Sequence, residues 1–413
     1  MSRGGGVYGA PVSGPLEGIR VIELGMWVAG PAAGGILADW GADVVKIEPP
    51  TGDPARQFAQ MIGSDVAINP AFEIDNRSKR SIALDLTTDD GRRVFLDLIA
   101  GADVFVTNIR IDALERLGLD APVVLAHNPR LVYGIITGYG LEGEERDRAA
   151  YDIGAFWARA GVAGVLTAPG SPPPFQRGGF GDHGVAMDLV AAINAALVAR
   201  DRPGGTGRGQ LVATSLLRHG MYTICFDLNT HLRLGVPIAI GSHETMSNPA
   251  MNCYRTKDDK WLWLIGLEAD RHFPTLCRSV DRPEWIGDPR FRDAAARREN
   301  VREMIAGFDA VFATRTRDEW AEAFDREDMW WAPVQNTEEV LADPQAWAGN
   351  AFLEVPDGSS VAMMINNPCD FVGTPTAARS MPPEIGEHTD EILGELGRSP
   401  DEIDALRASG AVR

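Results

Sequence analysis

Three short runs of sequence decide the fold: Ile19–Leu24 (IRVIEL), Pro31–Trp40 (PAAGGILADW) and Asp43–Ile47 (DVVKI). The first and third runs are short, apolar and rich in valine and isoleucine, as is typical of buried strands. The run between them begins at a proline, which suits the first position of a helix. Together the three runs predict a β-α-β unit near the start of the folded chain.

The same alternation continues through the N-terminal part of the chain. Further strands are expected at Ser81–Leu84, Asp103–Val106 and Leu131–Ile136, and helices near Asp89–Ala100 and Ala113–Leu117. Strands that alternate with helices predict an α/β fold in which helices cover both faces of a parallel sheet. We therefore expect a Rossmann-like large domain.

The glycine-rich stretch Gly25–Gly35 (GMWVAGPAAGG) follows the first predicted strand. It matches neither GxGxxG nor GxxxxGK followed by Ser or Thr, so the sequence does not indicate dinucleotide or ATP binding. Two roles remain open for these glycines, namely a tight strand-to-helix turn and the close approach of a ligand.

Helical patterns dominate the middle of the chain, and the texture changes after about residue 235. Asp152–Leu166 is expected to be a helix, and Gly184–Arg200 is apolar on almost every face, which predicts a helix buried on all sides. Asn248–Gly266 predicts a β-hairpin with its turn at Lys257–Asp259. We therefore expect a flexible leader at residues 1–14, a large domain at 15–220, a linker with a small α+β domain at 221–335, and a C-terminal segment at 336–413.

Composition and charge argue against several classes of function. The 413 residues carry 39 Lys and Arg against 58 Asp and Glu, a formal net charge of -19. Such a charge opposes binding to nucleic acid or to an anionic membrane, so neither is expected as a partner. The four cysteines form no CxxC pair and the seven histidines no HExxH motif, so we predict no metal and no disulfide framework. The N-terminus lacks the apolar run of a signal peptide, and a soluble, cytoplasmic protein is expected.

An anionic ligand of so acidic a protein must be held by local donors. Basic residues in predicted loops are the candidates, although each of them also fits an ordinary solvated surface charge. These residues are Arg56, Lys79, Arg80, Arg110 and Arg116.

Asp182 is the most informative polar residue, because it stands among glycines directly before the apolar helix, in Gly178–Gly184 (GGFGDHG). One interpretation is a helix N-cap, the ordinary role of an aspartate at such a place. The other is a nucleophile. The glycines leave room for a thioester, and N–H groups at the helix N-terminus would keep the carboxylate ionised and stabilise an oxyanion. Asp152, which follows Tyr151, is also an N-cap candidate.

A resemblance to a known family is carried by segments spread over nearly the whole chain. The segments are PLEGIRVIELGMWVAGPAAGGILADWGADVVKIEPPTGDPAR (Pro15–Arg56), NRSKRSIALDL (Asn76–Leu86), DVFVTNIRIDALERLGLD (Asp103–Asp120), LVYGIITGYG (Leu131–Gly140), GFGDHG (Gly179–Gly184), TGRGQLVATSLL (Thr206–Leu217) and IGEHTDEILGELG (Ile385–Gly397). In this order they resemble the family III CoA-transferases, the group that includes formyl-CoA transferase, carnitine CoA-transferase and α-methylacyl-CoA racemase. The resemblance implies that the C-terminal segment returns to the large domain, and that two ring-like chains interlock as a homodimer.

The resemblance also implies the chemistry. Asp182 matches the catalytic aspartate of the family, whose carboxylate attacks an acyl-CoA thioester and passes through an acyl-aspartyl anhydride and an aspartyl-CoA thioester. Coenzyme A, as part of acyl-CoA, is then the only cofactor-like requirement, and the partners are an acyl-CoA donor and a carboxylic acid acceptor. Other positions match residues that contact CoA or line the CoA or acyl site: Asn108, Arg116, Val28, Ala29 and Leu84.

Two alternatives stay open. The racemase branch has a His-Asp pair where this chain has Tyr151-Asp152. A phenol, with a pKa near ~10, is a poor base for an α-proton at neutral pH, which disfavours an α-methylacyl-CoA racemase or epimerase. Tyr151 and Asp152 are kept as candidate residues of the CoA site. The second alternative is a non-catalytic subunit that binds acyl-CoA.

Departures from the oxalate enzyme of the family bear on the substrate. Val28 stands where formyl-CoA transferase has glutamine and Pro49 where it has arginine, so oxalate and formyl-CoA are disfavoured. NPAMNCYRTKDDKWLWL (Asn248–Leu264) is similar to the branch that acts on larger acids, including 2-hydroxy, aryl and branched acids. We therefore expect a medium-sized organic acid. Candidates for an apolar acyl pocket, each of which also fits a core position, are Trp27, Phe156, Trp157, Met246 and Met251.

Overall fold

The computed structural model describes residues 14–61, 63, 66, 68–238 and 241–413, so the predicted leader lies outside the described residues except for Gly14. The chain forms two compact units. The larger takes the chain up to Val165, Pro174–Pro237 and Trp347–Arg413, and the smaller takes Leu166–Pro173 and Ile238–Ala346. The domain limits expected from the sequence stay a prediction.

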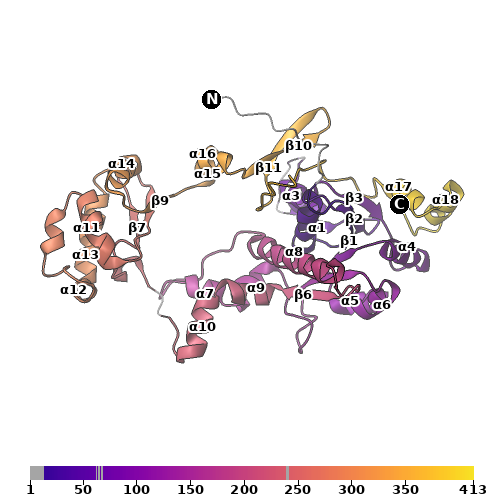
Figure 1. The fold of residues 1–413 in the computed structure, drawn as a ribbon, viewed down its shortest axis with the longest axis horizontal. Coiled ribbons are helices and arrows are strands. Elements are labelled where there is room, and N and C mark those ends of the chain that lie inside the picture. The colour runs from indigo at the N-terminus through magenta and orange to yellow at the C-terminus, as the bar shows by residue number, and fades with distance from the viewer. Residues whose placement is uncertain (1–13, 62, 64–65, 67, 239–240) are drawn as a thin grey trace. The chain divides into compact units, whose positions relative to one another are not determined.

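A six-stranded sheet forms the centre of the larger unit (Figure 1). Its strands are β1 (Arg20–Leu24), β2 (Asp43–Glu48), β3 (Arg80–Ala83), β4 (Val104–Thr107), β5 (Val132–Thr137) and β6 (Leu211–Ser215). They lie in the order β3-β2-β1-β4-β5-β6, and every neighbouring pair is parallel. This is the strand order of the doubly wound dinucleotide-binding folds. The predicted parallel α/β sheet is confirmed.

Helices pack on both faces of this sheet. Successive residues of a strand point to opposite faces, so Val21 of β1 packs in one cluster with Ala33 and Leu189, and Ile22 packs in another with Phe95. The helices of the larger unit are α1 (Ala29–Asp39), η1 (Pro54–Gln57), α2 (Phe58–Met61), α3 (Pro70–Asn76), α4 (Asp89–Ala100), α5 (Ile111–Leu117), α6 (Ala121–His127), η2 (Ile153–Arg159), α7 (Val162–Leu166), α8 (Phe180–Asp201), α9 (Leu216–Thr223), α10 (Cys225–Leu234), α17 (Thr389–Glu395) and α18 (Pro400–Ala408).

The C-terminal helices belong to the core of the larger unit. Ile392 of α17 and Leu406 of α18 are buried in the same cluster as Ile22. Leu84, just after β3, forms an antiparallel bridge with Val412 near the end of the chain. The larger unit also contains the antiparallel hairpin of β10 (Phe352–Asp357) and β11 (Ser360–Ile365).

Two helix predictions are wrong in detail. The stretch expected as the helix Asp152–Leu166 is a π-helix, η2, followed by the short helix α7, because Gly161 takes a left-handed conformation with φ of 92° between them. α8 is buried on one side only in this chain: Val185, Leu189 and Ile193 face the core, whereas the side chain of Val198 is 63% exposed. Length and composition of α8 would also fit a membrane span, a test that core helices pass as well.

The smaller unit has a three-stranded antiparallel sheet in the order β7-β8-β9. Its strands are β7 (Cys253–Arg255), β8 (Trp261–Leu264) and β9 (Trp331–Val334). The predicted hairpin is confirmed, since β7 and β8 pair on either side of Lys257–Asp259. An aromatic core with Tyr254 stacked on Phe312 holds the unit together. Its helices are η3 (His243–Thr245), α11 (Ala269–Ser279), η4 (Pro283–Gly287), α12 (Ala294–Glu299), α13 (Val301–Phe312), α14 (Arg317–Glu327), α15 (Thr337–Ala342) and α16 (Pro344–Ala348), the last of which runs across the limit at Ala346.

Candidate active site

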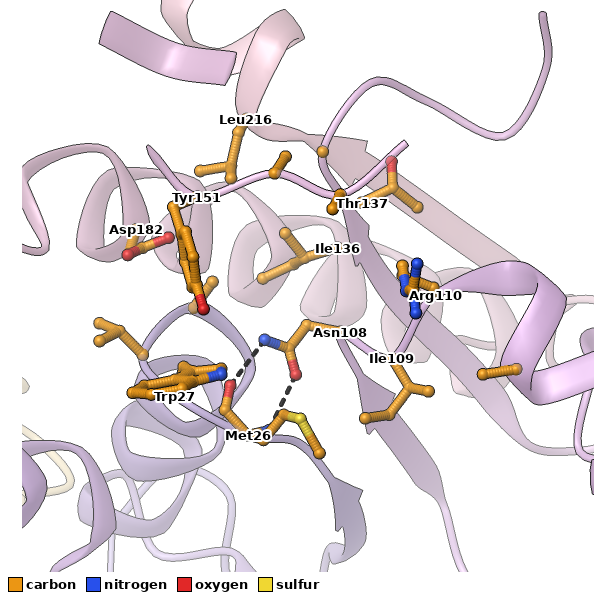
Figure 2. Close-up of a pocket in the computed structure, with 16 residues that line it drawn as sticks. Met26, Trp27, Asn108, Ile109, Arg110, Ile136, Thr137, Tyr151, Asp182 and Leu216 are labelled. Atoms are coloured by element: carbon orange, nitrogen blue, oxygen red, sulfur yellow. Dashed lines mark hydrogen bonds between the residues drawn. The ribbon is translucent and has the colours of Figure 1, made fainter. Parts of the chain in front are cut away.

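A cavity of about 450 Å³ opens at the carboxyl ends of the strands in the larger unit (Figure 2). The loops that follow β1, β4 and β5 form much of its wall, together with the N-terminal turns of α8 and α9. The strand order reverses between β1 and β4, and parallel sheets bind ligands outside the carboxyl ends at this point. Among the predicted site residues, Val28, Ala29, Asn108, Tyr151 and Asp182 line the cavity.

The loop between β1 and α1 is fixed by Asn108. The side-chain Oδ1 of Asn108 accepts a hydrogen bond from the backbone N–H of Met26 (3.0 Å), and Nδ2 donates to the Met26 carbonyl (2.8 Å). A Cβ atom on Gly30 would lie 2.7 Å from Oδ1 of Asn108, which explains one glycine of the predicted turn. Asn108 therefore shapes the cavity by holding backbone, and its amide is already engaged.

A buried cluster of charges lies beneath the same loop. The Nζ atom of Lys46 donates to Glu23, to Asp53 and to the carbonyl of Gly25, each at 3.0 Å. Asp53 in turn accepts from the backbone N–H of Trp27 at 3.1 Å. Burial lowers the pKa of Lys46, but the carboxylates of Glu23 and Asp53 outweigh burial and raise it above its ordinary value. Lys46 is thus a cation that ties the loop to the sheet.

Trp27 and Tyr151 form an aromatic wall of the cavity. Trp27 has a left-handed backbone (φ 64°), and its ring meets that of Tyr151 edge to face, with centroids 5.9 Å apart and an interplanar angle of 90°. Figure 2 shows the ring of Tyr151 between Asp182 and Trp27. Trp27 therefore lines the cavity, and its expected role in an acyl pocket stays a prediction.

Asp182 is the third residue of α8 and not its N-cap. The N-cap is Gly179, whose left-handed backbone (φ 75°) needs a glycine. Among the residues that the structure describes, no hydrogen bond reaches the Asp182 carboxylate. Burial, with a smaller contribution from the charge of Asp152, raises the pKa of Asp182 to about 7, and His183 partly opposes this shift. The N-cap interpretation is therefore wrong, as is the expectation that backbone donors hold this carboxylate ionised.

Asp152 caps a helix other than its own. It stands at the N-cap position of η2 without capping it, and its carboxylate instead accepts from the backbone N–H of Gly181 (3.2 Å) and from Nε2 of Gln176 (2.7 Å). The side chain is buried. Asp152 therefore anchors the glycine-rich turn that carries Asp182.

Two further candidates do not line this cavity. Leu84 is buried in the core where it pairs with Val412, and the guanidinium of Arg116 is exposed and pairs with Asp112 at 2.8 Å. Their expected contacts with CoA stay predictions. Arg110 does line the cavity.

The other basic candidates are engaged elsewhere. Arg56 pairs with Glu48, Lys79 is buried against Glu23, and Arg80 pairs with Asp43. These ion pairs stabilise the fold, which leaves Arg110 as the basic candidate in the cavity wall.

The remaining pocket candidates divide between the two units. Phe156 and Trp157 are buried in the core of the larger unit, and Met246 and Met251 belong to the smaller one. Within the described ranges, no group of three or more His, Cys, Asp or Glu side chains is placed to hold a metal ion.

Sequence reasoning missed part of the cavity. Ile136, Thr137 and Leu216 line it, and each stands at the end of, or directly after, a strand of the parallel sheet. Their position at strand ends was the signal that could have found them. The cluster around Lys46 gave no local signal, because its members come from separate strands and loops.

A cavity at the switch point of a doubly wound sheet, with the buried carboxylate of Asp182 in its wall, is the arrangement expected of an α/β enzyme. The comparison with known families is more specific. The family model for CoA-transferase family III matches residues 16–389, and the chain belongs to this family. It is a CoA-transferase, and CoA thioesters are its substrates.

Two relatives and one solved structure match this chain over nearly its whole length. The chain is 30% identical over 401 residues to the (R)-2-hydroxy-4-methylpentanoate CoA-transferase of Clostridioides difficile, covering 96% of this chain and 99% of that relative. It is 33% identical over 398 residues to the cinnamoyl-CoA:phenyllactate CoA-transferase of Clostridium sporogenes, covering 95% of each. The crystal structure of a CaiB/BaiF family protein from Brucella suis matches with a TM-score of 0.82 at 28% identity, covering 93% of this chain and 100% of that one.

Proposed function

We propose that this chain transfers CoA from an acyl-CoA to a carboxylic acid, with Asp182 as the covalent nucleophile. The observation that carries the proposal is the place of Asp182, which lines the cavity at the carboxyl edge of the sheet. Its carboxylate is held by no hydrogen bond from the part of the chain that the structure describes, so a lone pair is free to attack.

The proposed reaction proceeds through covalent intermediates on Asp182. A carboxylate oxygen of Asp182 attacks the thioester carbonyl of the donor, the C–S bond breaks, and the CoA thiolate leaves with the electron pair. The thiolate attacks the aspartyl carbonyl of the resulting anhydride and releases the donor acid as a carboxylate. The acceptor carboxylate then attacks the aspartyl-CoA thioester and releases the thiolate, which takes the acceptor acyl group and frees Asp182.

Neighbouring residues support this chemistry in separate ways. Arg110 offers a positive charge in the cavity wall, which suits the anionic groups of CoA or of an acid. Asn108 holds the loop between β1 and α1, and Asp152 anchors the turn that carries Asp182. The rings of Trp27 and Tyr151 reduce the access of water to an anhydride, which would otherwise hydrolyse.

The acid proposed is of medium size, with a branched or aromatic side chain. The names of the two relatives describe one acid of each kind. The apolar side chains of Trp27, Val28, Ile136 and Leu216 line the cavity and suit such a group.

A homodimer is also proposed. Helix α10 buries none of its residues, and the side chains of Phe226 and Leu232 are 77% and 82% exposed. Large apolar side chains with this exposure mark an interface with another chain. Sedimentation velocity should give twice the chain mass of 44.6 kDa for the wild type and a monomer for Phe226→Glu combined with Leu232→Glu. A monomeric wild type contradicts the proposal.

The transferase proposal is tested by measuring CoA transfer across a panel of acyl-CoA donors and acids by mass spectrometry. Asp182→Ala and Asp182→Asn should lose at least ~1,000-fold in kcat, because no other group takes the acyl intermediate. Circular dichroism should show that both variants stay folded. The same reactions in D₂O distinguish a transferase from a racemase, because a racemase exchanges the α-proton of the substrate with solvent and needs no acceptor acid. Undiminished transfer by Asp182→Ala would overturn the proposal.

A further inference from the structure

His183 directly follows Asp182, and both nitrogens of its ring face an acceptor. Nδ1 lies 2.9 Å from the backbone carbonyl oxygen of Gly179, and Nε2 lies 3.0 Å from Oδ1 of Asp75. A carbonyl oxygen can only accept a hydrogen bond, so Nδ1 carries a proton. An ionised Asp75 holds a second proton on Nε2, and the ring is then an imidazolium.

Among the neighbouring charged groups that the structure describes, His183 is the one that pairs with Asp75. Asp75, at the end of α3, is buried, and the charges behind it are already paired, Lys79 with Glu23 at 2.7 Å. His183 and Asp75 line a cavity of about 330 Å³. Arg77 and Asp39 also line this cavity, and their side chains pair with each other at 2.7 Å.

The pKa of His183 agrees with this arrangement. The hydrogen bond that His183 donates to Asp75 raises the pKa of His183 to about 9, although burial opposes the shift. Burial raises the pKa of Asp75 as well, and the contact with His183 opposes that shift. The side chain of His183 is 47% exposed, so solvent screens part of its field.

The ring also touches the turn that carries Asp182. The Gly179 carbonyl accepts from the backbone N–H of His183 (3.0 Å) as well as from its ring. A Cβ atom on Gly179 would lie 3.0 Å from the ring. The imidazolium therefore packs on the first turn of α8. Its charge lowers the pKa of Asp182, whereas burial and the negative charges of Asp152 and of Asp75 raise it.

We propose that His183, held as an imidazolium by Asp75, is a positioning residue that keeps Asp182 ionised for attack on the thioester. The inference rests on the proposed function of Asp182 and adds a residue to it.

The first test is the pH profile of kcat/KM for His183→Gln, which keeps a hydrogen-bonding group but removes the charge. The acidic limb should move to higher pH by about half to one unit. Activity relative to wild type should then fall about 3- to 10-fold at pH 6 and less than ~3-fold at pH 9. His183→Lys restores the charge and should move the limb back. His127→Gln, on the exposed end of α6, is the matched control and should not move it.

A loss of equal size at every pH, or an unmoved profile, would overturn the inference, because a merely structural role does not shift the limb. The second test needs no activity: long-range ¹H–¹⁵N NMR of histidine-labelled enzyme should show an imidazolium at pH 7.5, assigned by its disappearance in His183→Gln. The ring should become neutral in Asp75→Asn. A neutral ring in the wild type refutes the inference even if the variants fail to fold. Full activity of Asp182→Ala would instead refute the proposed function, so the two failures are distinguishable.

Discussion

The carboxylate of Asp152 accepts a hydrogen bond of 3.2 Å from the backbone N–H of Gly181, and so caps the helix that bears the proposed nucleophile Asp182. This relationship joins two loops that are separate in sequence, the one after β5 and the glycine-rich turn before α8. It also places a second negative charge near Asp182, which contributes to the raised pKa of that carboxyl.

The first prediction concerns the pH dependence of transfer. Only ionised Asp182 attacks, so kcat/KM should fall as the pH falls through about 7, the raised pKa of Asp182. Asp152→Asn keeps an acceptor for Gly181 but removes the charge, and should move this limb to lower pH by about half to one unit. The shift has the opposite sign to that of His183→Gln. Asp89→Asn, on the exposed side of α4, is the control and should leave the limb in place.

The second prediction is that the buried carboxylate of Asp182, once ionised, lowers the free energy of unfolding. A carboxyl whose pKa is higher in the folded state than in the unfolded one binds more protons when folded, so stability falls as the pH rises from about 4 to about 7. Asp182→Asn should therefore be more stable than the wild type at pH 8.5. The gain should be smaller at pH 6 by about 1 kcal/mol. Urea unfolding at the two pH values measures the difference, and a gain that does not change with pH speaks against a raised pKa.

The third prediction concerns the buried cation under the first loop. Lys46→Met leaves Asp53 and Glu23 without this partner and should lower the free energy of unfolding by about 3–5 kcal/mol. Arg93→Ala, which breaks an exposed pair with Asp90, is the control and should cost less than ~1 kcal/mol. Urea unfolding followed by tryptophan fluorescence compares them. A cost below 1 kcal/mol for Lys46→Met would show that the cluster does not hold the loop.

The fourth prediction separates two arginines. Arg110 lines the cavity, whereas Arg116 is exposed and paired with Asp112. Arg110→Gln should raise KM for the acyl-CoA by about 10-fold, the effect of losing one charge-assisted hydrogen bond. Arg116→Gln should change it less than ~2-fold. Steady-state kinetics at low and physiological salt provide the comparison. The reverse ranking would restore the role that the family resemblance implies for Arg116.

The sequence predicted the parallel sheet well, because its strands are short buried runs whose period is local. Ile19–Leu24, Asp43–Ile47 and Leu131–Ile136 each lie within one or two residues of a strand in the structure. The strand order could not be predicted in the same way, since it depends on which strands pair across the chain. The π-helix at Ile153–Arg159 was also missed, because nothing in its apolar pattern distinguishes it from an α-helix.

At the candidate site, the identity of Asp182 came from a family resemblance, and its environment came from the structure. The local sequence Gly-Asp-His-Gly favoured an N-cap role for Asp182. In the structure the N-cap is the left-handed Gly179, so α8 already begins at Phe180 and Asp182 lies in its first turn. Asp75, the partner of His183, lies 108 residues away in sequence, and Asp152, the partner of Gly181, lies 29 residues away. Contacts over such separations carry no local signal, so the electrostatics of the site needed the fold.

The most direct test of the account is the covalent state of Asp182. The enzyme is incubated with acyl-CoA thioesters of branched and aromatic acids, trapped with hydroxylamine or borohydride, and analysed by intact mass and peptide mapping. The account predicts a modification on the peptide that contains Asp182, formed only with productive donors, and none in Asp182→Asn. Transfer that proceeds at full rate with an unmodified Asp182 peptide, or with the label on another residue, would contradict it.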